Sequence, residues 1–140
     1  MADLLNANDP LRERSLEFAV RIVETAKRIR EERREFALAD QLLRSGTSIG
    51  ANLSEAVFAS SRPDFLSKNK IALKECSETL YWLRLLFRCN LLPEAEYTSL
   101  DSDCSQLLRM MISVCKTIEA KQTTPSLKKG TPDDHPHFPH

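Results

Sequence analysis

The chain has few of the residues that build sheets, tight turns and reaction centres. Only 3 of its 140 residues are glycine, and aromatic residues make up 6%. Long runs of Ala, Leu, Glu and Arg favour helix instead, so we expect one all-α domain. No apolar run approaches the roughly 20 residues that span a bilayer, and the N-terminus has no signal-peptide pattern. The sequence therefore predicts a cytoplasmic protein without membrane contact.

Histidine is missing from the region expected to fold. All three histidines lie in the terminal HPHFPH, which excludes Ser-His and Cys-His catalysis before Lys121. Cys76, Cys89, Cys104 and Cys115 are too far apart for a zinc site or a CxxC redox motif, so we expect reduced thiols in the core or at an interface. We predict no enzymatic activity, no metal and no cofactor.

Apolar residues recur at the helical period in four segments. The first follows a cap at Asn8 or Asp9, and the second spans about residues 36–58. The third begins at a cap formed by Ser61 or Asp64 and ends at Asn90; the fourth opens at Pro93. Short connections predict an up-down-up-down four-helix bundle over residues 10–121. Residues 1–9 form a leader, and residues 122–140, with four prolines, are expected to be a disordered tail.

The second helix contains poor helix formers, SGTSIGANLS, at residues 45–54. Their intrinsic penalties relative to alanine sum to roughly 5 kcal/mol, so contacts must hold this segment helical. Gly46, Gly50 and Ser54 lie four residues apart and leave one side of the helix almost bare. We expect another backbone to approach that side closely, and assign Gly46 and Gly50 to an oligomer interface.

The third helix carries more apolar surface than one core stripe needs. Between Leu80 and Phe87 only Arg84 is polar, whereas a helix of a monomeric bundle is apolar on one side. Tyr81, Trp82 and Leu85 are therefore predicted to lie at a subunit interface. The alternative is that Trp82 lies against polar side-chain stems of neighbouring helices in the same chain.

Charge is balanced overall, with 20 basic and 20 acidic residues, so the chain has no general cationic field. Local basic clusters remain, and repetition in an oligomer would multiply them. The candidate nucleic-acid-binding residues are Arg28, Arg30, Arg33, Arg34, Arg44, Arg62, Lys68, Lys70 and Lys74. The alternative is that these are solvated helix faces with partners one turn away, such as Glu24 with Arg28 and Lys74 with Glu78.

Residues 41–56, QLLRSGTSIGANLSEA, and 62–83, RPDFLSKNKIALKECSETLYWL, carry a resemblance to a known family. They resemble the bacterial four-helix-bundle proteins first noticed as reading frames in intervening sequences of large-subunit ribosomal RNA genes, with the pattern R-S-x-x-S-I-(P or G)-A-N-x-x-E. Gly50 stands where many members have proline. The resemblance implies a left-handed bundle that assembles into a ring of five subunits. A related branch comprises accessory proteins of diversity-generating retroelements, which bind nucleic acid and a reverse transcriptase.

Together these features predict a non-enzymatic homo-oligomeric scaffold, most simply a homopentamer, that contacts RNA or DNA through repeated basic clusters. A reverse transcriptase is the protein partner that the resemblance implies. The alternative is an oligomeric protein-interaction module that binds no nucleic acid.

Overall fold

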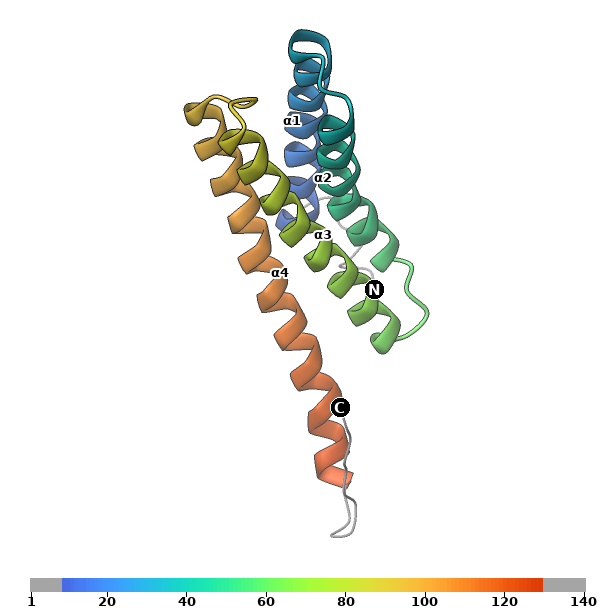
Figure 1. Ribbon diagram of the computed structural model, residues 1–140. Helices are drawn as coiled ribbons and strands as arrows, with labels where there is room; N and C mark the ends of the chain where they lie inside the picture. Colours follow the sequence, from blue (N-terminus) through green and yellow to red (C-terminus); the bar gives the residue numbers. More distant parts are fainter. Residues whose placement is uncertain (1–8, 130–140) are drawn as a thin grey trace.

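The computed structural model describes residues 9–129, with side chains as far as Lys121. The described chain forms four helices, α1 (Pro10–Arg33), α2 (Ala37–Ala56), α3 (Arg62–Arg88) and α4 (Glu94–Lys129), and no strand (Figure 1). The predicted all-α class and the four helical segments are confirmed.

Helix boundaries follow the predicted capping residues. The Asp9 carboxylate accepts a hydrogen bond from the Leu11 amide at 3.1 Å, and the Ser61 hydroxyl accepts one from the Asp64 amide at 3.2 Å. Asn90, which follows the C-cap residue Cys89 of α3, adopts a left-handed conformation with φ of 62°. These contacts satisfy backbone groups that have no partner within the helix.

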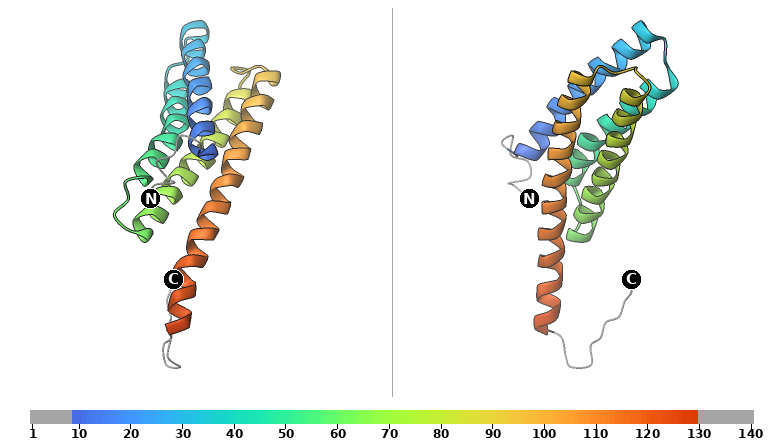
Figure 2. Two further views of the ribbon diagram at one scale, coloured as in Figure 1. Left: turned by 180° about the vertical axis from the view of Figure 1, so that it is seen from behind. Right: turned by 60° about the vertical axis from the view of Figure 1, so that its left-hand side comes forward.

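The helices pack so that each contacts the next and α4 also contacts α1, while α1 and α3 are not neighbours among the described residues. They occupy diagonal positions, as the views from opposite sides show (Figures 1 and 2). The predicted inner stripes meet along the centre, where Ile22, Ile49, Leu83 and Met111 are fully buried. Burial of these side chains is the main stabilising contribution.

The α4 helix continues past the predicted end of the bundle at Lys121 and reaches Lys129, so it projects beyond the other three (Figure 1). The expected tail from residue 122 is thus helical backbone in its first part, with Pro125 inside the helix. Residues 1–8 of the predicted leader and residues 130–140 of the predicted tail lie outside the described residues.

Several of the polar side chains among the poor helix formers of α2 are hydrogen-bonded to the backbone of the same helix. The hydroxyls of Thr47 and Ser48 donate to the carbonyls of Leu43 and Arg44 at 2.7 and 2.6 Å. The Asn52 amide donates to the Ser48 carbonyl at 2.9 Å. Side chains that could compete with the helix are therefore bonded to its own backbone, and tertiary packing overrides the low propensity.

In the part of the chain that the structure describes, no helix is both long and apolar enough to cross a membrane.

Candidate nucleic-acid and subunit interfaces

The bare side of α2 faces α1 of the same chain. A Cβ atom at Gly46 would lie 2.8 and 2.9 Å from the two γ carbons of Ile22, which is itself fully buried. At Gly50 a Cβ would lie 3.1 Å from the Ser15 hydroxyl. The close helix approach that we predicted exists, but it is a contact within the subunit. Gly46 is buried there and offers no surface to a second copy, which corrects its assignment to the oligomer interface.

Replacing Gly50 by leucine is expected to lower the free energy of unfolding by about 1–2 kcal/mol, because the new side chain must displace Ser15. On an open helix face the same change would stabilise by up to about 1 kcal/mol. Denaturant midpoints measured at equal subunit concentration give the sign. A higher midpoint for the variant would show that α1 does not restrict this position.

A groove of about 410 Å³ lies over Gly50, between α1 and α2. Small side chains make up much of its lining, including Ser15, Ala19, Thr47 and Ala51. Among the described side chains, no group of three His, Cys, Asp or Glu residues could hold a metal ion, in this groove or elsewhere.

Polar residues of α2 are bonded to α3. Arg44 forms ion pairs with Glu75, at 3.2 Å, and with Glu78. The Thr79 hydroxyl donates to the Ser45 hydroxyl at 2.9 Å, and both residues are fully buried. The guanidinium of Arg44 and the two hydroxyls are therefore all bonded across the α2–α3 contact, so Arg44 is not a free cation.

Ion pairs within the subunit also occupy four more of the predicted nucleic-acid-binding residues. Arg28 forms a bidentate pair with Glu96 on α4, with distances of 2.6 and 2.8 Å. The others pair as follows: Arg30 with Asp40 at 2.5 Å, Lys68 with Glu55 at 2.9 Å, and Lys70 with Glu119 at 2.8 Å. The predicted pairs Glu24–Arg28 and Lys74–Glu78 are wrong, because the carboxylate partner of Arg28 and the cation partner of Glu78 lie on other helices.

The two paired lysines are held in their charged form. A hydrogen bond to the Glu55 carboxylate raises the pKa of Lys68, and one to Glu119 raises the pKa of Lys70. Their charge is nevertheless balanced by an adjacent carboxylate. The cluster of Lys68, Lys70 and Lys74 therefore presents less positive potential than its sequence indicates.

Three arginines gather where α1 ends, and we call Arg30, Arg33 and Arg34 the basic end. Arg33 donates to the Asn90 carbonyl at 2.7 Å, so this end of α1 meets the α3–α4 connection. The guanidinium groups of Arg30 and Arg34 lie over the Phe36 ring, 5.2 and 5.6 Å from its centre. Arg33 and Arg34 make no ion pair with a described residue, and both are exposed. Arg62, at the other end of the bundle, donates to the Lys121 carbonyl at 3.5 Å.

The predicted apolar interface on α3 is partly exposed in the single subunit. Tyr81 is 59% exposed, and its ring contacts Trp82 edge to face. Trp82 is half-buried, packs against the core and donates its indole N–H to Glu78 at 2.9 Å. Trp82 therefore has a polar partner on its own helix, whereas the alternative interpretation expected side chains of neighbouring helices, and Tyr81 does not bury its ring. Leu85 is half-buried.

Two of the four cysteines form a close pair. The sulfurs of Cys76 and Cys104 lie 3.5 Å apart between α3 and α4, both fully buried. The contact with Cys76, together with burial, raises the pKa of the Cys104 thiol far above its usual range. Burial likewise raises the pKa of Cys115, whereas Cys89 is exposed. All four are free thiols, and three lie in the interior as expected.

Thiol labelling at pH 8 is expected to separate these cysteines, because the thiolate is the reacting form. Cys89 should react at the rate of an exposed thiol. The labelling rates of Cys76 and Cys104 should be lower by roughly a hundredfold or more, because the reagent reaches these thiols only when the bundle opens. Mass spectrometry after a short alkylation checks this, and equal labelling of all four cysteines would contradict the described packing.

A family model described as 23S rRNA-intervening sequence protein matches residues 10–113. The match covers α1, α2, α3 and most of α4. The chain belongs to the 23S rRNA-intervening sequence protein family.

A solved structure supports the same assignment. A protein of unknown function from the S23 ribosomal protein family of Bacteroides thetaiotaomicron is 48% identical, with a TM-score of 0.75. The similarity covers 76% of this chain and 95% of that one. No curated protein matches the chain.

Contacts within the subunit account for several of the residues that carry the resemblance to the 23S rRNA-intervening sequence protein family. In the pattern at residues 44–55, Arg44 and Ser45 bind α3, Ile49 lies in the core, and Glu55 pairs with Lys68. The pattern therefore fixes how α2 packs.

Proposed function

We propose that this member of the family is a non-enzymatic, cytoplasmic scaffold that binds RNA or DNA as a homo-oligomer. Its subunit is a left-handed up-down-up-down bundle, and the assembly is a ring of five. The observation that supports nucleic-acid contact is the basic end, where Arg33 and Arg34 are exposed and have no carboxylate partner among the described residues. Guanidinium groups of this kind suit phosphate binding.

Binding should depend on assembly. The segment around the basic end also contains Glu31, Glu32 and Glu35, so a single subunit has little net positive charge there. A ring places five basic ends close together, and the several arginines then contact neighbouring phosphates at the same time. Such repetition raises the apparent affinity without any new contact.

Filter binding to RNA and DNA, each single- and double-stranded, tests the proposal. We expect retention at low salt without sequence preference, because no base-reading motif is present. The affinity should fall by several tens-fold or more between roughly 50 and 200 mM salt. An assembled protein that retains no nucleic acid at low salt would contradict the function.

A reverse transcriptase is the protein partner included in the proposal, on the basis of the resemblance to retroelement accessory proteins. Co-purification with a reverse transcriptase encoded beside this reading frame tests it. A genome that has a ribosomal RNA gene at this position and no such enzyme would contradict the partner but not the nucleic-acid contact.

The second candidate is an oligomeric protein-interaction module. Internal ion pairs favour it, because five of the nine predicted cations are already neutralised within the subunit: Arg28, Arg30, Arg44, Lys68 and Lys70. If the assembled protein binds no nucleic acid in the filter assay, the protein-interaction module remains as the function.

A further inference from the structure

The outer face of α1 carries an apolar stripe that no element of the described chain covers. Leu16, Val20 and Val23 are 60%, 51% and 46% exposed. They follow at steps of four and three residues, so they lie on one side of the helix. Beside them runs an acidic row, Glu13, Glu17 and Glu24, all exposed and without an ion partner among the described residues. We call this set the α1 face.

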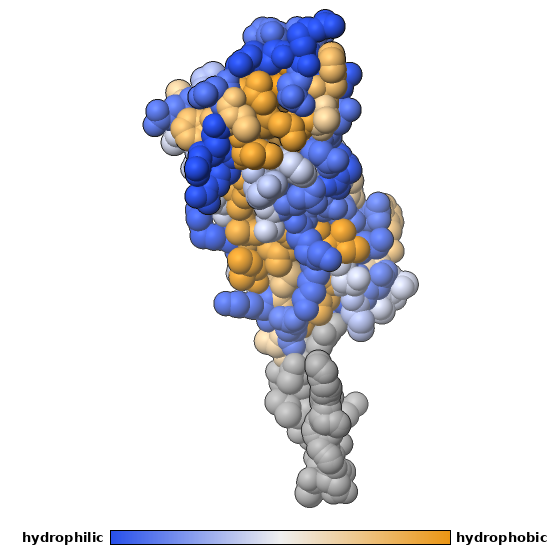
Figure 3. Space-filling view, in the orientation of Figure 1, coloured by the Kyte–Doolittle hydropathy of each residue, from blue (hydrophilic) through white to orange (hydrophobic). Residues whose placement is uncertain are grey.

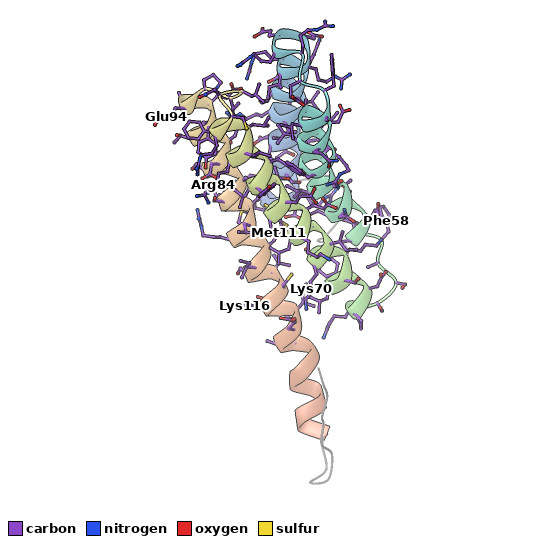
Figure 4. All side chains as sticks on the ribbon, viewed as in Figure 1. Phe58, Lys70, Arg84, Glu94, Met111 and Lys116 are labelled. Atoms are coloured by element: carbon purple, nitrogen blue, oxygen red, sulfur yellow. The ribbon has the colours of Figure 1, made fainter. Side chains whose placement is uncertain are left out.

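The outer side of α3 carries one exposed aromatic residue, Tyr81, with basic residues around it. Tyr81 is 59% exposed, and Lys74 and Arg88 lie seven residues before and after it on the same side of the helix. Arg84 is also exposed, on the α4 side of α3 (Figure 4). These three cations form no ion pair with a described residue. Figure 3 shows apolar areas interleaved with hydrophilic ones on the side where α3 lies. We call this set the α3 face.

We propose that the α1 face of one subunit packs against the α3 face of the next copy of the same chain. The inference rests on the self-association in the proposed function and identifies the surfaces that form it. The α1 face carries an acidic row beside its apolar stripe, with the exposed Lys27 at the end of that stripe, and the α3 face carries basic residues around Tyr81, so the predominant charges of the two faces are opposite in sign. The charged rows have similar lengths, about 16 Å from Glu13 to Glu24 and about 21 Å from Lys74 to Arg88, at 1.5 Å per residue.

Charge selects this pairing over the two symmetric ones. Two α1 faces together would place glutamates against glutamates, and two α3 faces would place lysine and arginine against each other. Like charges across an interface cost several kcal/mol. Because α1 and α3 are diagonal in the bundle, each subunit presents the two faces on opposite sides. An interface between two different faces continues from copy to copy, and it closes into a ring when the rotation permits.

Charge reversal on either face provides the test. Glu17→Lys with Glu24→Lys alters the α1 face, and Lys74→Glu with Arg84→Glu alters the α3 face. Light scattering coupled to size exclusion should show that each double variant requires roughly tenfold or more protein to assemble. Circular dichroism establishes that the variants remain helical. The matched controls are Glu32→Lys on α1 and Arg109→Glu with Lys116→Glu on α4, which should assemble like the wild type.

Mixing the two double variants tests whether the α1 face of one subunit meets the α3 face of another. In an equimolar mixture the two unaltered faces can meet, and the two reversed faces are complementary as well, so the mixture should assemble by alternating the two variants although neither variant assembles alone. The quadruple variant, in which both faces are reversed, should assemble again because the charges are complementary once more. This rescue keeps the test decisive if one double variant fails to fold.

Three results would overturn the inference. The pairing is refuted if the wild type assembles and both double variants keep the same assembled mass. It is also refuted if only one of the two double variants loses assembly. Both results leave the proposed scaffold intact. A mixture that stays monomeric, with no rescue in the quadruple variant, also refutes it. A monomeric wild type would instead contradict the self-association itself.

Discussion

Replacing Gly46 by leucine is expected to lower the free energy of unfolding by about 3 kcal/mol or more. Even the first carbon of the new side chain would lie 2.8 Å from Ile22. Ile22 is branched at its β carbon and fully buried, so it has little freedom to move away from the new side chain. The gain of about 1 kcal/mol in helix propensity does not offset this overlap.

Urea midpoints at equal subunit concentration measure the effect. Ser54→Ala is the control, since Ser54 lies on the same bare stripe but is exposed, and it should change stability by less than about 0.5 kcal/mol. A Gly46→Leu variant as stable as the wild type would mean that α1 and α2 are farther apart than described.

Reversing two charges at the basic end should have the largest effect on nucleic-acid binding. Arg33→Glu with Arg34→Glu changes each subunit by four charges, and a ring of five repeats the change. We expect the affinity at low salt to fall roughly a hundredfold or more, equally for all sequences. Filter binding measures the loss, and light scattering checks that the variant still assembles.

The matched control is Lys68→Glu with Lys70→Glu, two reversals of the same size at residues already paired with Glu55 and Glu119. These changes should weaken binding much less. If they weaken binding as much as the arginine variant, the lysine cluster of α3 is a contact surface and the assignment to the basic end is wrong.

The features that the sequence predicted well are those set by neighbouring residues. Asp9, Ser61 and Asn90 cap helices as expected, because a cap depends on the few residues that follow or precede it. The inner stripes were predictable because the helical period places their residues on one side. Even the glycine-containing segment of α2 is predictable as helix, because Leu42, Ile49 and Leu53 recur at the helical period.

The features that sequence reasoning missed depend on how helices meet. Arg28 pairs with Glu96 and Arg44 with Glu75, and these partners follow from the register between helices, which no local pattern gives. The bare stripe predicted a close contact without indicating whether the partner was α1 or another subunit. The exposed stripe of Leu16, Val20 and Val23 did have a signal, a second helical period in the first segment.

The mass of the wild-type protein in solution tests the account most directly. Light scattering coupled to size exclusion at micromolar subunit concentration should give about five times the 15.9 kDa of the chain, with no larger species growing as the concentration rises. A mass of 15.9 kDa over the whole range would contradict the account, because neither repeated basic ends nor paired faces could then exist.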